Sequence, residues 1–315
     1  MNKKLFGLIA LVAFGGALTS CDTDVETIDV QKPFEYSEQY YQNLRDYKQS
    51  KHEVAYAYYA FWAPLEGVDG YKDPASMGER IIGLPDSIDI VNLWMGIPTP
   101  EEHPIAYKDM VQAQTQRGTR FVMHADASHY RHKFTVDGVD YDMGGNVPDD
   151  EMMDAYARWI RSQVDNNGLD GVDIDFEGWN QSSLLKLVTL LGEYYGPMGS
   201  NPEKLLIVDY FNTTPNVKNE PYVDYFVQQA YSKQNASPRF ISGVPSEKMI
   251  FVDAFDEGHG PSGARILDYA RVEPADGGNK GGCGAYYIEY NYASTSGIPY
   301  NEYRKAIQIM NPAVH

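Results

Sequence analysis

Short apolar runs alternate with amphipathic stretches from residue 53 to near the end of the chain. The apolar runs have the length and the near-continuous hydrophobicity of strands that are buried on both faces. The stretches between them repeat apolar residues every three or four positions, as helices on a core do. The pattern predicts eight strands, at residues 53–61, 87–95, 119–124, 169–177, 204–211, 225–231, 248–255 and 284–291.

Helices are predicted between most of these strands, and a hairpin is expected near Asp137 and Gly138 in the long loop 126–148. Eight strands that alternate with helices predict an α/β fold, a single-domain (β/α)8 TIM barrel. An open doubly wound sheet is the alternative, but no Gly-rich phosphate loop follows the first strand. The helices are expected at residues 37–47, 104–116, 149–167, 182–196, 264–272 and 300–310.

The fourth predicted strand carries three carboxylates on one face. Successive side chains on a strand point to opposite faces, so Asp173, Asp175 and Glu177 share a face. Like charges so close repel one another, and burying them is costly unless protons, hydrogen bonds or a substrate compensate. Asp170 has the opposite parity and is expected to anchor the start of the strand. Barrel active sites lie at the carboxyl ends of the strands, so Glu177 should lie at the rim.

This row suits proton transfer. A Glu at a strand end with an Asp two residues deeper can act as a general acid. Glycoside hydrolysis needs such an acid, and usually a second carboxylate across the sugar. A Mg²⁺ or Ca²⁺ site is the main alternative, because carboxylates bind both ions. Metal ligands normally come from several elements, and no matching His or Asp cluster stands out, so neither a metal nor another cofactor is expected.

The stretch from Asp170 to Glu177, Asp-Gly-Val-Asp-Ile-Asp-Phe-Glu, resembles the full signature Asp-Gly-x-Asp-x-Asp-x-Glu of glycoside hydrolase family 18. It falls on the fourth strand, where that family has it, and the resemblance extends by architecture over residues 53–312. The family cleaves with retention by substrate-assisted catalysis. The resemblance implies that Glu177 protonates the glycosidic oxygen and later activates water. Asp175 would hold the substrate's 2-acetamido group as it forms an oxazolinium ion, and Asp173 would tune Asp175.

The family also places a Tyr at the end of the sixth strand, where Tyr231 is the candidate beside Gln229. Chitinases of the family have Met-x-Tyr-Asp there, and this chain departs from that form. The segment between the seventh and eighth strands is too short for the α+β insertion of many family chitinases. Both departures resemble compact bacterial endo-β-N-acetylglucosaminidases, which cut the N,N'-diacetylchitobiose core of N-linked glycans. A non-catalytic glycan-binding protein on the same fold and a chitinase or chitodextrinase remain alternatives.

Other residues are weaker candidates for substrate binding. Trp179 could stack on a sugar or cover the barrel rim. The remaining candidates end other strands: His124 and Asp126 the third, and Asn212 the fifth, where Asp209 and Tyr210 compete with it. Core packing is expected for Trp62 and Trp94. On the predicted eighth strand, Tyr287, Glu289 and Asn291 share one parity, and either that set or its alternate faces inward.

The N-terminal residues are predicted to lie outside the fold. Residues 1–20 read as a signal peptide with a lysine pair, an apolar run and a lipobox that ends before Cys21. Cys21 is the expected lipidation site, residues 21–36 a tether, and residues 37–315 the catalytic domain. The acidic residues Asp22, Asp24 and Glu26 that follow Cys21 are similar to the acidic runs of Bacteroidetes-type surface lipoproteins. These features predict an exported protein anchored to a membrane, with the outer membrane and cell surface preferred.

The acidic charge of the chain limits the classes of molecule that it is expected to bind. The chain has 26 basic and 44 acidic residues, and the expected cleavage changes its net charge from −18 to −20, because residues 1–20 contain two lysines and no acid. Such a surface repels nucleic acid and anionic membrane, so a neutral glycan partner is favoured and no nucleic-acid partner is expected. With Cys21 lipidated, Cys283 has no disulfide partner and is expected to be a small buried residue. We expect a monomer.

Overall fold

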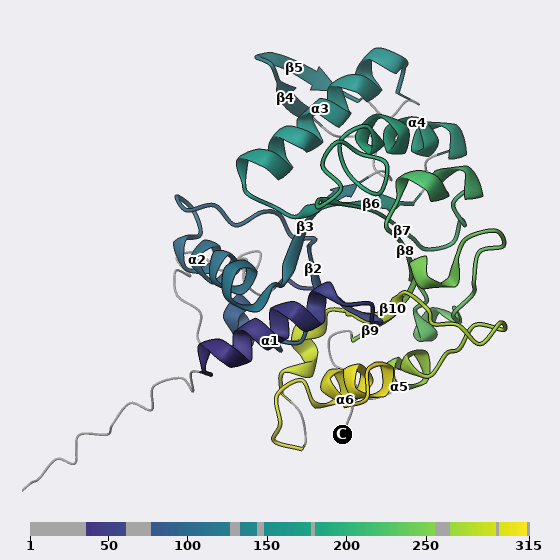
Figure 1. Cartoon of the computed structure of the whole chain (residues 1–315). Helices are drawn as coiled ribbons and strands as arrows, with labels where there is room; N and C mark the ends of the chain where they lie inside the picture. The colour runs from purple at the N-terminus through teal and green to yellow at the C-terminus, as the bar shows by residue number, and fades with distance from the viewer. Residues whose placement is uncertain are drawn as a thin grey trace, which may run out of the picture. The chain divides into compact units, whose positions relative to one another are not determined.

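Eight parallel strands close into a barrel with helices around it (Figure 1). The computed structural model describes residues 36–60, 77–126, 133–143, 148–177, 180–255, 265–293 and 296–313. Round the barrel the strands run β1-β10-β9-β8-β7-β6-β3-β2, which follows the chain once the separate β4–β5 hairpin is set aside. The predicted TIM barrel is confirmed.

The observed elements match the expected series closely. The barrel strands are β1 Val54–Tyr58, β2 Ile90–Leu93, β3 Arg120–Asp126, β6 Gly171–Phe176, β7 Leu205–Tyr210, β8 Tyr225–Gln229, β9 Met249–Ala254 and β10 Gly282–Tyr286, and the hairpin strands are β4 Lys133–Val136 and β5 Val139–Asp142. The α-helices are α1 Glu38–Gln49, α2 Pro104–Gln112, α3 Asp150–Asn166, α4 Gln181–Gly192, α5 Ile266–Ala270 and α6 Asn301–Met310. The hairpin turns at Asp137 and Gly138, both with positive φ, as predicted.

The core has two layers, as the barrel fold requires. The larger layer lies between the strands and the helices, where α3 contributes Tyr156 and Ile160 and α4 contributes Leu187 and Leu191. The smaller layer fills the barrel interior. Its members are Val54, Tyr56, Tyr58, Ile90, Val122, Leu205, Ile207, Val227, Tyr231, Ile250 and Val252. Cys283 is buried, as expected.

Aspartates fix the amino ends of three strands by the same contact. Asp89 Oδ2 accepts a hydrogen bond from the Ala55 N–H at 2.7 Å, and Asp224 Oδ2 accepts one from the Leu206 N–H at 2.8 Å. Asp170 Oδ2 likewise accepts from the Phe121 N–H at 2.8 Å, so the expected anchoring role of Asp170 is confirmed. Each bond joins a strand to its neighbour in the barrel and helps fix their register.

The eighth strand was predicted too far along the chain. β10 begins at Gly282 and ends at Tyr286, and Ile288–Asn291 form a 3-10 turn instead of more strand. Tyr287 has φ 54°, a left-handed conformation that ends the strand. The parity argument for Tyr287, Glu289 and Asn291 was therefore wrong.

Glu289 lies in the turn after β10 and is 2% exposed. Burial raises the pKa of its carboxyl to about 8, and backbone N–H groups oppose that rise only in part. Tyr300, which precedes α6, is also buried and lies close enough to interact electrostatically with this carboxyl. Glu289 is thus an internal acid that favours its neutral form at neutral pH.

The N-terminal helix α1 lies across the amino end of the barrel (Figure 1). Ser37 caps it, since its side chain accepts a hydrogen bond from the Tyr40 N–H, as the sequence suggested. The expected signal peptide, Cys21 and nearly all of the tether lie outside the described residues. Among the helices that the structure describes, none combines the length and the apolar character that crossing a bilayer demands.

Candidate active site

The acidic row of β6 runs from the barrel interior to its carboxyl end. Asp173 is completely buried, the Asp175 side chain is 15% exposed, and Glu177 is half-buried directly after the strand. The predicted order of depth is confirmed. Carboxyl groups at three depths therefore lie along one strand, with the outermost able to meet a ligand at the rim.

Gly171 lets this strand begin where it does. Its φ is +148°, a conformation that side chains rarely adopt, and it pairs with Leu205 of β7. A Cβ on Gly171 would lie 2.2 Å from the Leu205 carbonyl oxygen. The glycine of the signature is therefore needed for the close approach of β6 and β7, which fixes the position of the carboxylates beyond it.

Asp173 is held by two hydrogen-bond donors from β1 and β2. The Tyr56 hydroxyl donates to Asp173 Oδ2, and Asn92 Nδ2 donates to the same oxygen at 2.9 Å. Burial raises the pKa of Asp173, while these two hydrogen bonds oppose the rise. Asp173 Oδ1 has no hydrogen-bond partner among the described residues. Asp173 is therefore a fixed internal carboxyl that can hold a proton close to Asp175.

A second buried carboxyl, Asp209, lies on β7 directly beside Asp175 in the strand register. The Tyr58 hydroxyl donates to Asp209 Oδ2, and Gln229 Nε2 donates to that oxygen at 3.2 Å. Burial, reinforced by the negative charges of Asp173 and Asp175, raises the pKa of Asp209 well above its ordinary value. The cluster thus contains more carboxyls than the β6 row alone provides, and they compete for protons.

Asp175 has polar neighbours on both sides. Gln229 Nε2 donates to Asp175 Oδ1 at 3.3 Å, and His124 Nε2 lies 3.7 Å from Asp175 Oδ2. Asn92 Nδ2 lies 3.3 Å from His124 Nδ1. The Nε2 edge of the His124 ring therefore faces Asp175, and its Nδ1 edge faces Asn92. The two neighbours hold Asp175 at the boundary between the buried cluster and the rim.

An aromatic wall stands beside these acids. Tyr231 stacks on Tyr286 with ring centroids 5.6 Å apart, and the ring centroid of Phe211 lies 5.8 Å from that of Tyr231. Trp94 packs against Tyr286 at 5.2 Å. Burial raises the pKa of Tyr231, and the negative charges of Asp209, Asp175 and Glu177 contribute, so its hydroxyl stays protonated close to the acids. Half-buried aromatic faces beside hydrogen-bonding groups suit a sugar ring.

The structure brings together most of the residues that the sequence singled out. Tyr231, Gln229 and His124 lie around Asp175 and Glu177, although β8 ends at Gln229, before Tyr231. Asn212 follows β7 and is exposed. The backbone of Asp126 pairs with Asp175 in the register of β3 and β6. The Asp126 side chain, Trp62 and Trp179 lie outside what the structure describes.

Sequence reasoning missed several partners of the acids. Tyr56 and Tyr58 alternate with alanines in β1, a signal that could have placed both hydroxyls inside the barrel. Strand alternation could also have distinguished Asp209 from Tyr210. Neighbouring side chains on a strand point to opposite faces, so if Tyr210 points outward, Asp209 points into the barrel. Asn92 and Tyr286 had no such signal, since their roles depend on contacts with distant strands. Among the described residues, no group of three or more His, Cys, Asp or Glu side chains is arranged to hold a metal ion.

Comparisons with known proteins find relatives by sequence and by fold. A sequence profile described as glycoside hydrolase family 18, BT1044-like, matches residues 19–242. The Elizabethkingia meningoseptica protein endo-beta-N-acetylglucosaminidase F2 is 25% identical over 310 residues, which covers 86% of this chain and 85% of that protein. The residues that the profile matches include the whole acidic row.

Solved structures show the same fold. The structure of BT1044 aligns with a TM-score of 0.67 at 20% identity, over 87% of this chain and 93% of that one. The endo-beta-N-acetylglucosaminidase from Cordyceps militaris, in its apo form, aligns with a TM-score of 0.65 at 23% identity. That alignment covers 89% of this chain and 98% of the Cordyceps chain. The likeness extends over nearly the whole barrel.

Proposed function

This chain belongs to glycoside hydrolase family 18 and is a glycoside hydrolase, and on that premise we propose that it is a retaining endo-β-N-acetylglucosaminidase acting on N-linked glycans. It would cut the N,N'-diacetylchitobiose core between its two N-acetylglucosamines. One observation carries the proposal: Asp175 lies between buried carboxyls and the half-buried Glu177, with the Tyr231 hydroxyl close to both. That arrangement supplies a proton donor and an orienting carboxylate at one edge of a sugar site.

Glu177 is the proton donor in this proposal. Its half-buried position at the end of β6 lets it meet the glycosidic oxygen of a sugar that enters from the rim. It gives its proton as the bond between the anomeric carbon and that oxygen breaks. The resulting carboxylate then takes a proton from the water that attacks the anomeric carbon, which returns Glu177 to its starting form.

The substrate supplies the nucleophile. The carbonyl oxygen of its 2-acetamido group attacks the anomeric carbon and forms an oxazolinium ion, which water opens with net retention. The Asp175 carboxylate accepts a hydrogen bond from the acetamido N–H, and the negative charge of Asp175 stabilises the oxazolinium ion. Gln229 and His124 hold the Asp175 carboxylate, and the Asp173 carboxyl below it can take up or release a proton. Tyr231, with its hydroxyl kept protonated, can donate to the acetamido oxygen.

The comparisons support N-glycans as the substrate class. The Elizabethkingia relative is named an endo-beta-N-acetylglucosaminidase. A mutant of the Cordyceps militaris enzyme, which aligns with a TM-score of 0.63 at 21% identity, was solved in complex with fucosyl-N-acetylglucosamine-Asn. That ligand is the protein-linked part of an N-glycan core. Solved chitinases also share the fold with a TM-score of 0.51, so chitin is the competing substrate.

The assay for this proposal compares the native chain with Glu177→Gln and with the control Glu203→Gln. Glu203 is an exposed carboxylate at the opposite end of the barrel. Each protein is incubated with an N-glycosylated protein and, separately, with chito-oligosaccharides. Native chain and control should release glycan from the protein, whereas Glu177→Gln should bind it and release at least about 100-fold less. Cleavage of chito-oligosaccharides alone would support the chitinase alternative, and binding without release by the native chain would support the glycan-binding one.

We further propose that the protein is an exported lipoprotein held to the membrane through Cys21, and that it acts as a monomer. The basic start, apolar run and lipobox of residues 1–21 support the anchor. Metabolic labelling with a fatty acid tests it: the native chain should incorporate label, and Cys21→Ser should not. Incorporation that persists in Cys21→Ser would contradict the assignment of that residue.

A further inference from the structure

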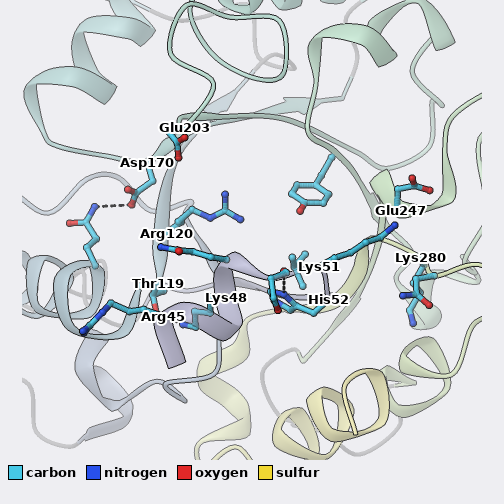
Figure 2. A pocket seen from close by; sticks show the side chains of 17 residues that line it. Arg45, Lys48, Lys51, His52, Thr119, Arg120, Asp170, Glu203, Glu247 and Lys280 are labelled. Atoms are coloured by element: carbon cyan, nitrogen blue, oxygen red, sulfur yellow. Dashed lines mark hydrogen bonds between the residues drawn. The ribbon is translucent and has the colours of Figure 1, made fainter. Parts of the chain in front are cut away.

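A cavity of about 800 Å³ lies at the amino end of the barrel, opposite the acidic row. The second half of α1 and the start of β1 form one side of it, and Arg120 projects into it from the start of β3 (Figure 2). Its volume lies in the range of sites for small organic ligands, which is roughly 300–1,000 Å³. It belongs to no part of the site described above.

The lining of this cavity has the opposite charge to the rest of the protein. The basic residues that line it outnumber the acidic ones, whereas the whole chain has a net charge of −18. The basic residues are Arg45, Lys48, Lys51, His52, Arg120 and Lys280, and the acidic ones are Asp170, Glu203 and Glu247. Positive groups collected in a hollow focus their field and concentrate anions there.

Several of these basic side chains already have protein partners. Lys280 pairs with Glu53, and His52 Nε2 lies 3.0 Å from Asp89 Oδ1. The Arg45 guanidinium donates to Glu38 and to the Gln116 carbonyl oxygen. These contacts leave Lys48, Lys51 and Arg120 as the cations to consider for a ligand.

Arg120, Lys48 and Lys51 form no ion pair with a carboxylate in the part of the chain that the structure describes. Arg120 bonds to the Tyr225 hydroxyl, which occupies only part of its five-donor guanidinium. Lys48 donates to the Ile88 carbonyl oxygen and to Thr119 Oγ1, both uncharged. Burial lowers the pKa of Lys48 to about 8, and the negative charges of Asp89 and Asp86 oppose that fall only in part.

The carboxylates near Arg120 do not need it as their partner. The charge of Arg120 acts on Asp170 and Asp224 through space, yet these two carboxylates, like Asp89, each accept a backbone N–H bond from a neighbouring strand. Burial also raises the pKa of Asp170, and that of Asp224 to about 6. An incoming anion therefore meets Arg120 without displacing an existing ion pair.

We propose that this amino-end cavity binds a phosphate group, as a phosphate monoester or diester, through Arg120 with Lys51 and Lys48. The planar guanidinium matches two phosphate oxygens, and the flexible, exposed Lys51 can reach a third. The volume beyond the phosphate leaves room for the organic group it is joined to. Two sources share this chemistry, a soluble phosphate ester and the headgroup of an anionic lipid.

The first experiment measures binding of inorganic phosphate to the full chain by calorimetry, in chloride buffer of matched ionic strength. The native chain should bind one equivalent saturably. Arg120→Gln should weaken binding at least about tenfold, Lys51→Gln should weaken it less, and the exposed control Lys218→Gln should leave it unchanged. Lys51→Gln changes a solvent-exposed side chain and should not disturb folding, so this variant still tests phosphate binding if Arg120→Gln perturbs the fold.

The second experiment separates the two sources. Sedimentation with phosphatidylglycerol vesicles is compared with sedimentation with phosphatidylcholine vesicles, so that apolar segments contribute equally to both. An excess on phosphatidylglycerol that Arg120→Gln and Lys51→Gln reduce supports the lipid headgroup, and phosphate binding without that excess supports a soluble ester. The proposal is overturned when the native chain shows no saturable phosphate binding, or when neither variant changes it. Glycosidase activity plays no part in either readout.

Discussion

Asp175 and Asp209 face each other across adjacent strands, and one side-chain amide bonds to both. Gln229 Nε2 donates to Asp175 Oδ1 at 3.3 Å and to Asp209 Oδ2 at 3.2 Å. Only Asp175 reaches the rim, because Asp209 is completely buried. Two carboxylates that close cannot both be ionised at low cost, and burial raises the pKa of Asp209 well above its ordinary value, which favours its neutral form. In the proposed mechanism the negative charge is then carried by Asp175, the carboxyl nearer the rim.

The first prediction concerns Asp209→Asn. The amide oxygen of the new side chain can accept from Tyr58 and Gln229, as the neutral acid does, but it cannot ionise. Near pH 6 the variant should therefore keep kcat within about tenfold of the native value. The raised pKa of Asp209 means that the native site gains a repelling charge as pH rises, so the alkaline fall of kcat should begin at higher pH in Asp209→Asn.

Full pH profiles of kcat and KM check this, with Asp224→Asn as the matched control. Asp224 is also a carboxyl whose pKa burial raises, to about 6, but it lies at the other end of the barrel. Its substitution should leave the shape of the kcat profile unchanged. A loss of kcat beyond about 100-fold at every pH in Asp209→Asn would mean that Asp209 must be ionised to function.

The second prediction concerns Asp175→Asn. An amide at this position carries no negative charge to stabilise the oxazolinium ion, so kcat should fall by about 100- to 1,000-fold. The fold should persist, because the amide oxygen of the new side chain can still accept a hydrogen bond from Gln229 or His124. Steady-state kinetics and a thermal melt measure both effects, and Asp142→Asn, in the exposed hairpin, is the control. Full activity in Asp175→Asn would rule out substrate assistance.

The third prediction concerns Gly171→Ala. The added methyl group would lie 2.2 Å from the Leu205 carbonyl oxygen, in a backbone conformation that favours glycine. The variant should lose about 2–4 kcal/mol of unfolding free energy, and activity should fall because the acids on β6 move. Gly168→Ala is the control: its φ is +64°, but no atom of the described residues lies within 4 Å of the place its methyl group would take. It should cost only about 1 kcal/mol. Equal losses in denaturant melts would contradict the steric argument.

The fourth prediction concerns Glu289→Gln. The folded state raises the pKa of Glu289 to about 8 from the ordinary 4.5, so it binds this proton more tightly than the unfolded chain does. The cost of burying the acid therefore grows as pH rises from about 4.5 to about 8, and native stability falls over that window. Glu289→Gln removes that cost. Its Tm should exceed the native Tm more at pH 8 than at pH 5.

Melting curves from pH 5 to pH 8 measure this difference, with the exposed Glu273→Gln as control. The expected gain at pH 8 is on the order of a few kcal/mol, since one pKa unit corresponds to about 1.4 kcal/mol. A Tm difference that is the same at both pH values would show that Glu289 is not buried as an acid.

Local sequence patterns predicted the barrel because each strand and helix carries its own signal. The apolar runs and the glycine and aspartate positions were enough to order eight strands and to place the β6 acids by depth. The error at β10 has a local cause: Tyr287 turns the chain with a positive φ, and a tyrosine gives no warning of that. Residues 287–291 are as apolar and aromatic as a strand would be.

The partners of the acids were harder to predict, because they come from strands far apart in sequence. Tyr56 reaches Asp173 from β1 and Tyr58 reaches Asp209 from the same strand, contacts that exist only once the barrel closes. Gln229 was expected to bind substrate, but its amide bonds to Asp175 and Asp209. The positive cavity at the amino end likewise depends on where α1 packs. Spacing along one strand or helix predicts which of its residues share a face. Closure of the barrel decides which faces of distant strands come into contact.

The mass of a glycoprotein after incubation with the native chain tests the central claim most directly. The account predicts that each occupied asparagine keeps a single N-acetylglucosamine, with its core fucose where one is present, and that Glu177→Gln leaves the glycan intact. An asparagine stripped of every sugar, or a glycan that the native chain leaves whole, would contradict the account.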